Sequence, residues 1–359
     1  MSEAFDFIDL LSISQLNENK LHILLEEFKT PEAIKNAKTD DLNSLVGAEI
    51  ANRIKILKAD NTITKKYDLL AKLNIKVVPY YSPDYPKWLK MIDHFPPVLF
   101  IRGKIEEMDE ISVAVVGTRG ATVYGKNIAR NFAGEFAQAG VTLVSGMARG
   151  IDTEAHYGAL ENKGRTIAVL GCGVDICYPP ENKKLMQMII KNGAIVSEFN
   201  IGTPPLAKNF PKRNRIVSGL SRAIVAIEAK EKSGVMNTVN WAVDQNKDVF
   251  AIPGNIYSRT SSGTNRLIKE GAIPVTSAAE ILESLGVQHT MQERQAKQVV
   301  LTDTEKIIWD KLSSEPIYLD ILSEDLNQPT GFILNILLGL EIKGVVKQLP
   351  GMMFVKNFK

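Results

Sequence analysis

From residue 111 to about residue 285, short apolar runs alternate with longer segments in which apolar residues recur every three or four positions. The short runs are SVAVVG (112–117), VTLVSG (141–146), TIAVLG (166–171), AIVSE (194–198), AIVAIEA (223–229) and DVFAIPG (248–254). Such runs are typical of strands buried on both faces of a parallel sheet, with the longer segments as covering helices. The alternation predicts an α/β fold, an extended Rossmann-like, doubly wound and mostly parallel sheet.

Residues 1–65 have a helical pattern throughout, in two similar passages. The first contains Thr30-Pro31, a typical N-cap followed by the first residue of a helix. The second, residues 38–57, places a turn at Gly47 between two helical stretches. Helix, glycine turn and helix outline a helix-hairpin-helix or SAM-like all-α domain, whose turn amides can meet a DNA phosphate. Because such hairpins usually have two glycines, we favour the alternative of a small packing or interaction domain.

The pattern divides the rest of the chain into a domain over 66–286, a polar linker over 287–300 and a domain over 301–359. Residues 66–110 are rich in Pro and aromatic residues, which predicts irregular chain packed against the sheet. The last domain has three short helices and a hairpin that turns near Pro350-Gly351, the outline of a winged helix.

The third helix expected in this C-terminal domain, TGFILNILLGLEIKG (330–344), is largely apolar and has one Lys. A helix that reads DNA exposes polar and basic side chains to the base edges. We therefore favour contact with protein over sequence-specific reading of DNA.

Composition sets few limits on function. The 359 residues carry a formal net charge of +2, so a nucleic-acid site must come from local clusters of Arg and Lys. Cys172 and Cys177 form neither a disulfide scaffold nor a zinc set, and we expect no metal. No apolar segment approaches the ~20 residues of a membrane span, and the expected location is the cytoplasm.

The turn after the first predicted strand, GTRGATVYG (117–125), looks like a phosphate-binding loop. A dinucleotide fingerprint needs G-x-G-x-x-G and, about 20 residues later, an acid for the ribose. Here the glycine spacing differs, and Ser145-Gly146 stand where the acid belongs. No Walker G-K-[ST] follows either. Arg119 is the informative residue, because a planar cation suits both a phosphodiester and a base face.

Two other turns carry further candidates. In SGMARGIDTEAH (145–156), Ser145 and Gly146 are expected to present backbone donors and Gly150 to open a helix, whose N-terminus favours an anion. Asp152 lies in the first turn of that helix, where capping is favoured over catalysis. The turns in 251–272 add Gly254 and Asn255, which let backbone approach a ligand closely.

The densest cluster of cations lies in TPPLAKNFPKRNRIVSGLS (203–221). Cations interleaved with an aromatic residue suit single-stranded nucleic acid, because they follow the backbone while the ring stacks on a base. The alternative is a solvated basic helix start with the aromatic ring in the core. The cluster contains Lys208, Asn209, Phe210, Lys212, Arg213, Asn214 and Arg215, with Arg222 just beyond it.

Seven segments, in order over residues 80–285, resemble the DNA-processing protein A family, also called Smf. They are VAVVGTRGATVYG, LVSGMARGIDTEAH, TIAVLGCGVDICYPPEN, FPKRNRIVSGLS, VAIEAKEKSGVMNTVNWA, VFAIPGN and SSGTNRLIKEGA. The resemblance implies a cytoplasmic bacterial protein that binds incoming single-stranded DNA in natural transformation. It also implies a homodimer, loading of the RecA recombinase onto that DNA, and no cofactor.

The resemblance also assigns DNA contacts to residues of this chain. The family's arginine in the first turn falls on Arg119, and its phenylalanine falls on Phe210. Some members have a lysine three residues before that phenylalanine; here Ala207 holds the position, and Lys208 is the expected substitute. The remaining assigned positions are Gly117, Thr118, Ser145, Gly146, Met147, Ala148, Arg149, Gly150, Arg213, Asn214 and Arg215.

An enzyme that acts on a nucleotide is the alternative from another class, because related sheets host nucleotide phosphoribohydrolases. Those enzymes carry a P-G-G-x-G-T-x-x-E turn, which this chain lacks. Glu228 and Asp152 are the acids placed where they could assist glycosidic cleavage. We expect a protein that binds DNA without catalysis.

Overall fold

A computed structural model describes residues 2–13, 15–57, 61–287, 301–313 and 316–356. A nine-stranded sheet forms its centre, in the order β1-β2-β6-β5-β4-β3-β7-β8-β9. Strands β3 to β9 run parallel, and β1 and β2 are antiparallel at one edge. The strands are β1 (Ile75–Pro79), β2 (Val98–Gly103), β3 (Ser112–Val116), β4 (Thr142–Ser145), β5 (Thr166–Val169), β6 (Gly193–Ser197), β7 (Ala223–Ala226), β8 (Asp248–Ala251) and β9 (Ile273–Pro274). All six predicted strands are confirmed.

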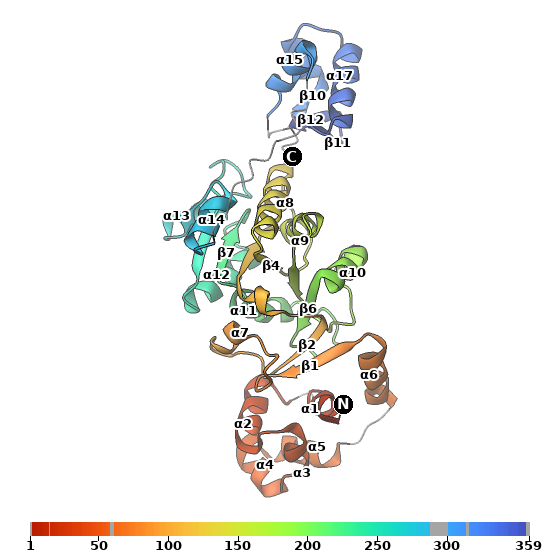
Figure 1. The fold of residues 1–359 in the computed structure, drawn as a ribbon, viewed down its shortest axis with the longest axis vertical. Coiled ribbons are helices and arrows are strands. Elements are labelled where there is room, and N and C mark those ends of the chain that lie inside the picture. Colours follow the sequence, from red (N-terminus) through yellow and green to blue (C-terminus); the bar gives the residue numbers. More distant parts are fainter. Residues whose placement is uncertain (1, 14, 58–60, 288–300, 314–315, 357–359) are drawn as a thin grey trace.

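Helices cover both faces of the sheet, because alternate residues of each strand point to opposite sides. In β3, Val113 and Val115 face one core, while Ala114 and Val116 face the other. One face packs against α8 (Val123–Gln138), α9 (Ile151–Glu161), α10 (Lys183–Asn192) and α14 (Ala278–Ser284). The other packs against α7 (Lys87–Lys90), α11 (Asn209–Gly219), α12 (Gly234–Asp244) and α13 (Ser262–Lys269). The doubly wound architecture is therefore confirmed (Figure 1).

The segment 66–110 is more ordered than predicted. Strands β1 and β2 pair with each other, and β2 extends the sheet by pairing antiparallel with β6. Five of the six residues of β2 are buried. The interpretation as irregular chain was wrong because the apolar run VLFI finds its partner strand nearly a hundred residues further along the chain.

The N-terminal helices are confirmed and lie beyond the β1–β2 edge of the sheet (Figure 1). Thr30 caps α3 by accepting the Ala33 amide, and Gly47 separates α4 from α5 with φ at +89°. The expected boundary at residue 65 falls inside α6, which packs against β1. The helices are α1 (Ser2–Leu10), α2 (Glu18–Phe28), α3 (Pro31–Asn36), α4 (Thr39–Val46), α5 (Ala48–Ile56) and α6 (Asn61–Lys72).

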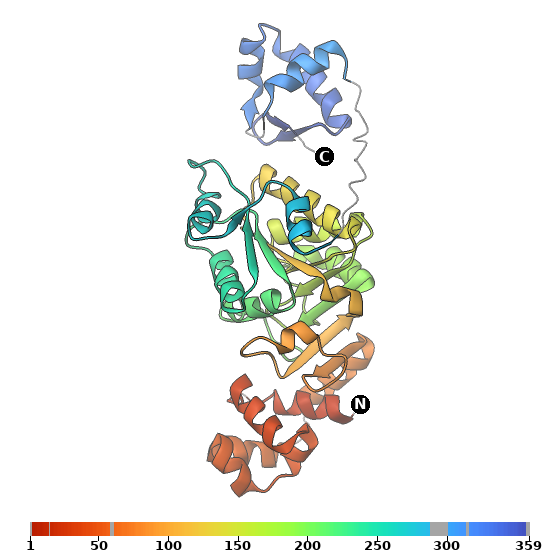
Figure 2. The ribbon, with the colours of Figure 1, turned by 60° about the vertical axis from the view of Figure 1, so that its left-hand side comes forward.

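The C-terminal residues form the predicted winged helix, a separate small body in Figure 2. It contains α15 (Asp303–Lys311), β10 (Ile317–Tyr318), α16 (Leu319–Asp325), α17 (Thr330–Ile342), β11 (Val346–Leu349) and β12 (Met353–Lys356). The hairpin β11–β12 turns at Pro350-Gly351, as expected. The expected linker 287–300 lies, apart from residue 287, outside the described residues. Among the described helices, none has the length and apolar character of a membrane span.

Candidate nucleic-acid interface

A pocket of about 610 Å³ opens at the carboxyl ends of β3 and β4. From β3 the chain proceeds through β4, β5 and β6 on one side and then returns to β7 on the other. Ligands of open α/β sheets bind at such a topological switch point. The pocket is lined by Val116, Gly117, Thr118, Arg119, Gly146, Ala148, Asp152, Tyr178, Pro205, Ala207, Phe210, Pro211, Arg213, Asn214, Val217, Ser233, Gly234, Val235 and Thr238.

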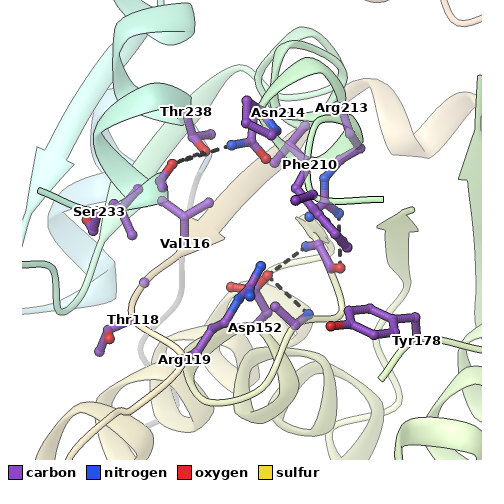
Figure 3. Close-up of a pocket in the computed structure, with 18 of the residues that line it drawn as sticks. Val116, Thr118, Arg119, Asp152, Tyr178, Phe210, Arg213, Asn214, Ser233 and Thr238 are labelled. Carbon is purple, nitrogen blue, oxygen red and sulfur yellow. Dashed lines mark hydrogen bonds between the residues drawn. The ribbon is translucent and has the colours of Figure 1, made fainter. Parts of the chain in front are cut away.

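An aromatic pair and an arginine converge on one side of this pocket (Figure 3). The half-buried ring of Phe210 lies 5.5 Å from that of Tyr178, and the guanidinium of Arg119 lies 5.4 Å from the Phe210 centroid. A Cβ at Gly171 would approach Phe210 Cδ1 to 2.9 Å, so the ring rests against glycine backbone. Arg119 is exposed and has no carboxylate partner within the described chain. The site therefore pairs a presented ring with an available cation.

The turn that carries Arg119 is held by the buried carboxylate of Glu228. Thr122 donates to Glu228 from its amide, at 2.9 Å, and from its hydroxyl, at 2.6 Å. The Thr118 amide donates to the Glu228 carbonyl at 2.7 Å. Gly150 packs so closely on this turn that a Cβ would lie 2.4 Å from the Thr118 carbonyl oxygen, and its φ of +79° also favours glycine. The two loops thus brace each other beneath Arg119.

Asp152 organises the second turn. Its carboxylate accepts the amides of Gly146, at 3.1 Å, and Ala148, at 3.3 Å. Burial raises the pKa of Asp152 to about 6, although Arg213 and these amides favour the charged form. The expectation that this acid caps its own helix was wrong, because α9 has no side-chain cap and the Asp152 carboxylate holds the preceding loop instead. The expected free donor at Gly146 is also absent, since its amide is already used.

The other residues of the second turn differ in their exposure. Ser145 and Met147 are fully buried, and the Ser145 hydroxyl donates to the Val115 carbonyl at 2.6 Å. Ala148 lines the pocket, whereas Arg149 is exposed and ion-paired with Glu181. A direct DNA contact at each of these positions stays a prediction.

Arg213 is buried behind the pocket. Its guanidinium donates to the carbonyl of Gly146 at 3.0 Å and to the carbonyl of Val169. Burial lowers its pKa to about 10, against the opposing charge of Asp152. Arg213 therefore joins the ends of β4 and β5 and gives the pocket its rear wall.

Arg215 lies on the opposite side of α11, away from the pocket. It donates to both oxygens of Glu198, at 2.8 and 2.7 Å, and pairs with Glu18 of α2. Burial disfavours its charge, yet the two carboxylates outweigh burial and raise its pKa. Lys212 reaches the same two acids, at 2.9 Å and 3.2 Å. These two motif cations are occupied by internal ion pairs that also anchor the N-terminal helices.

The remaining predicted residues are spread around the pocket. Buried Asn209 donates to the Gly171 carbonyl at 3.1 Å, and Asn214 lines the pocket and donates to Asn237 at 3.1 Å. Lys208 is exposed at the start of α11, beside Ala207 in the lining. Gly254 and Asn255 lie on the turn after β8, outside the lining.

Tyr178 lines the pocket and contacts Phe210, although the sequence analysis does not predict it as a site residue. It lies in the segment CYPPEN after β5, and an aromatic residue directly before two prolines was the available signal. Cys172 and Cys177 are free thiols, and burial raises the pKa of both. No group of three His, Cys, Asp or Glu residues in the described chain could hold a metal.

A doubly wound sheet with a pocket at its switch point, followed by a winged helix, defines the class of protein as a Rossmann-like domain joined to a winged-helix domain. Residues 76–286 match the family described as DNA recombination-mediator protein A, and residues 292–352 match the DprA winged helix domain. The chain belongs to this DprA/Smf family.

Named relatives and solved structures agree with this assignment. Protein Smf of Escherichia coli (strain K12) is 37% identical over 290 residues, which cover 79% of this chain and 78% of that protein. The X-ray structure of DNA processing protein A from Streptococcus pneumoniae superposes with a TM-score of 0.69 at 33% identity, over 78% of this chain and 97% of that one.

A structure of DNA processing protein A from Helicobacter pylori, described as revealing that protein's single-stranded DNA binding mode, superposes with a TM-score of 0.54 at 31% identity. The match covers 59% of this chain and 96% of that one.

Proposed function

We propose that this protein binds single-stranded DNA in the pocket at the switch point. The observation that carries the proposal is the ring of Phe210, which contacts the ring of Tyr178 and the guanidinium of Arg119, a cation without a carboxylate partner in the described part of the chain. A splayed base stacks on such a ring, and a guanidinium beside it contacts the neighbouring phosphate. Paired bases of a duplex do not offer their faces, so the same geometry favours a single strand.

We infer that the pocket does not catalyse a reaction. Glu228 accepts hydrogen bonds from Thr122, and Asp152 accepts them from Gly146 and Ala148. Both acids that could assist glycosidic cleavage therefore hold loops in place. Release of free base from nucleoside monophosphates by the purified protein would contradict this inference.

Membership of the recombination-mediator family supports a finer proposal. The protein holds incoming single-stranded DNA in natural transformation, acts as a homodimer, and loads RecA recombinase onto that strand. Faster assembly of RecA on an oligonucleotide in the presence of this protein would support the loading step. Sedimentation at several concentrations tests the dimer, with a single monomeric species as the contradicting result.

The test of DNA binding is a titration of labelled oligothymidylate and of a duplex with the full chain. Arg119→Ala removes a charge-assisted contact and is expected to weaken single-strand binding about tenfold or more. Arg53→Ala is the matched control, because Arg53 is an exposed arginine paired with Glu49 in the N-terminal helices. Equal affinities for the wild-type protein and Arg119→Ala would overturn the proposed site.

A further inference from the structure

The turn between β8 and α13 exposes two large apolar side chains. Tyr257 is 90% exposed and Ile256 is 78% exposed. Isolated exposed apolar residues are ordinary, but two neighbours at the tip of a loop form a contiguous apolar surface of the kind that a partner covers. The position of this loop identifies the partner.

Hydrogen bonds at the base of the loop hold its conformation. The side chain of Asn265 accepts the Gly254 amide at 3.1 Å and donates to the Gly254 carbonyl at 2.9 Å. The side chain of Asn255 accepts a hydrogen bond from the Tyr257 amide at 2.9 Å. The backbone carbonyl of Asn255 accepts one from the Ser258 amide, also at 2.9 Å. Tyr257 is therefore presented on a fixed turn, which lowers the entropy lost when a ligand binds.

The loop lies beside the turn that carries Arg119. Glu228 accepts a hydrogen bond from Thr122 in that turn, at 2.6 Å, and another from Thr260 in this loop, at 3.2 Å. The Ala229 amide donates to the Thr260 carbonyl at 2.7 Å. One carboxylate thus fastens both turns to the carboxyl edge of the sheet, and the loop lies next to the Arg119 turn on the side of β8, outside the lining of the pocket.

The surface around the loop has the charge that a phosphate backbone requires. Lys230, Lys232 and Arg259 are exposed, and none of the three has an ion-pair partner within the described chain. Glu231 lies among them, and Arg266 is occupied by Glu270 at 2.7 Å. Unpaired cations beside an exposed ring are the arrangement that binds a single strand.

We propose that Tyr257 is a second stacking position for the same single strand. A strand whose base stacks on Phe210 crosses Arg119 and places a later base on Tyr257, while Arg259 and Lys230 contact phosphates between the two. This inference rests on the proposed function and extends it. It predicts that a short oligonucleotide occupies the Phe210 position alone and that only a longer one reaches both.

The experiment compares two oligothymidylates, of about 4 and about 20 nucleotides, in competition titrations with the full-length protein. Tyr257→Ala is expected to weaken binding of the long oligonucleotide about 5- to 150-fold and to leave the short one unchanged. Phe210→Ala weakens both. Tyr318→Ala is the control, because Tyr318 is a tyrosine of the winged helix whose surface is 52% exposed.

Three outcomes overturn the inference or its basis, and they are distinguishable. If Phe210→Ala weakens binding and Tyr257→Ala leaves the long oligonucleotide unaffected, the second position is wrong and the proposed function stands. Equal weakening of both oligonucleotides by Tyr257→Ala also refutes a separate second position. If neither variant changes binding, the proposed function itself fails.

A spectroscopic readout checks stacking directly. In Tyr257→Trp the indole sits at the tip of the loop, and its fluorescence is expected to be quenched by the long oligonucleotide and not by the short one. The double variant Tyr257→Trp with Phe210→Ala tests whether one strand contacts both positions. Loss of quenching in this double variant at low DNA concentration supports a single strand that spans the two. Absence of quenching at saturating DNA contradicts stacking at this position.

Discussion

Helix α11 of the sheet domain and helix α17 of the winged helix both carry a phenylalanine at the surface, and they differ in the charge that accompanies it. Helix α11 presents Phe210 to a pocket that also contains Arg119. Helix α17, the third helix of the winged helix, exposes Phe332 (47%) and Ile342 (89%). Within the described chain no cation lies over the Phe332 ring. Both helices thus expose a phenylalanine, and only α11 combines it with charge.

The burial of cations therefore matters as much for a binding surface as their number. Helix α11 contains three cations in its motif, yet Arg213 and Arg215 are buried and Lys212 is ion-paired. These cations shape the pocket and anchor the helix, while Arg119, from another loop, supplies an available charge. The expectation that α17 contacts protein stays a prediction, and its apolar surface agrees with it.

The largest effect is expected on the stability of the protein, from a substitution of Arg213 in the rear wall of the pocket. Arg213→Met removes the buried donor to the carbonyls of Gly146 and Val169 and the cation that favours the charged form of Asp152, and it is expected to lower the free energy of unfolding by about 3–5 kcal/mol. Urea denaturation measures this loss. Lys208→Met, at an exposed position of the same segment, should change stability by less than about 0.5 kcal/mol. Equal stability of the two variants would contradict a structural role for Arg213.

The next effect is a dependence of stability on pH. The pKa of Asp152 is raised from 3.8 to about 6 in the folded protein, so the unfolded chain releases this proton first as the pH rises. The contribution of Asp152 to stability therefore falls between about pH 4 and pH 6, by about 3 kcal/mol. Asp152→Asn cannot titrate. The unfolding free energy of the wild type relative to this variant should decrease over that window, and a constant difference would refute the shift.

A pair of phenylalanine substitutions tests the comparison of the two helices directly. Phe210→Ala removes a stacking surface and is expected to weaken single-strand binding by about 1–3 kcal/mol. Phe332→Ala in α17 is the matched control and should leave the affinity unchanged. Fluorescence anisotropy with one oligonucleotide measures both variants. Equal losses would mean that the winged helix shares in binding the strand.

The smallest effect is expected in the dependence of affinity on salt. Lys208 is exposed at the start of α11, and Lys208→Ala should lower the slope of log K against log salt concentration by about 0.7, the value for one phosphate contact on a single strand. Lys347→Ala, on the exposed surface of β11, should leave the slope unchanged. An unaltered slope in Lys208→Ala would exclude Lys208 as the substitute for the lysine missing at Ala207.

Local sequence was sufficient to predict the strands β3 to β8 and the turn at 117–125, because both follow from short-range patterns. Continuous Val, Ile and Ala runs such as Val113–Val116 place apolar side chains on both faces of a strand. This pattern is favourable only where both faces of the sheet are buried. Strand β2 is not predicted by its local sequence, because its apolar run is stabilised by pairing with β6, far along the chain. Antiparallel pairing at the edge of a parallel sheet leaves no local signal.

The doubly wound sheet, the winged helix and the cluster in which Phe210 stands can all be predicted from the amino-acid pattern. Which cations of that cluster remain available depends on the folded structure. Arg213 reaches a carbonyl 67 residues away, and Arg215 reaches Glu18 at a separation of 197 residues. Burial and ion pairing depend on neighbours brought together by the fold, so the sequence shows that cations are present and the structure shows which of them can meet a phosphate.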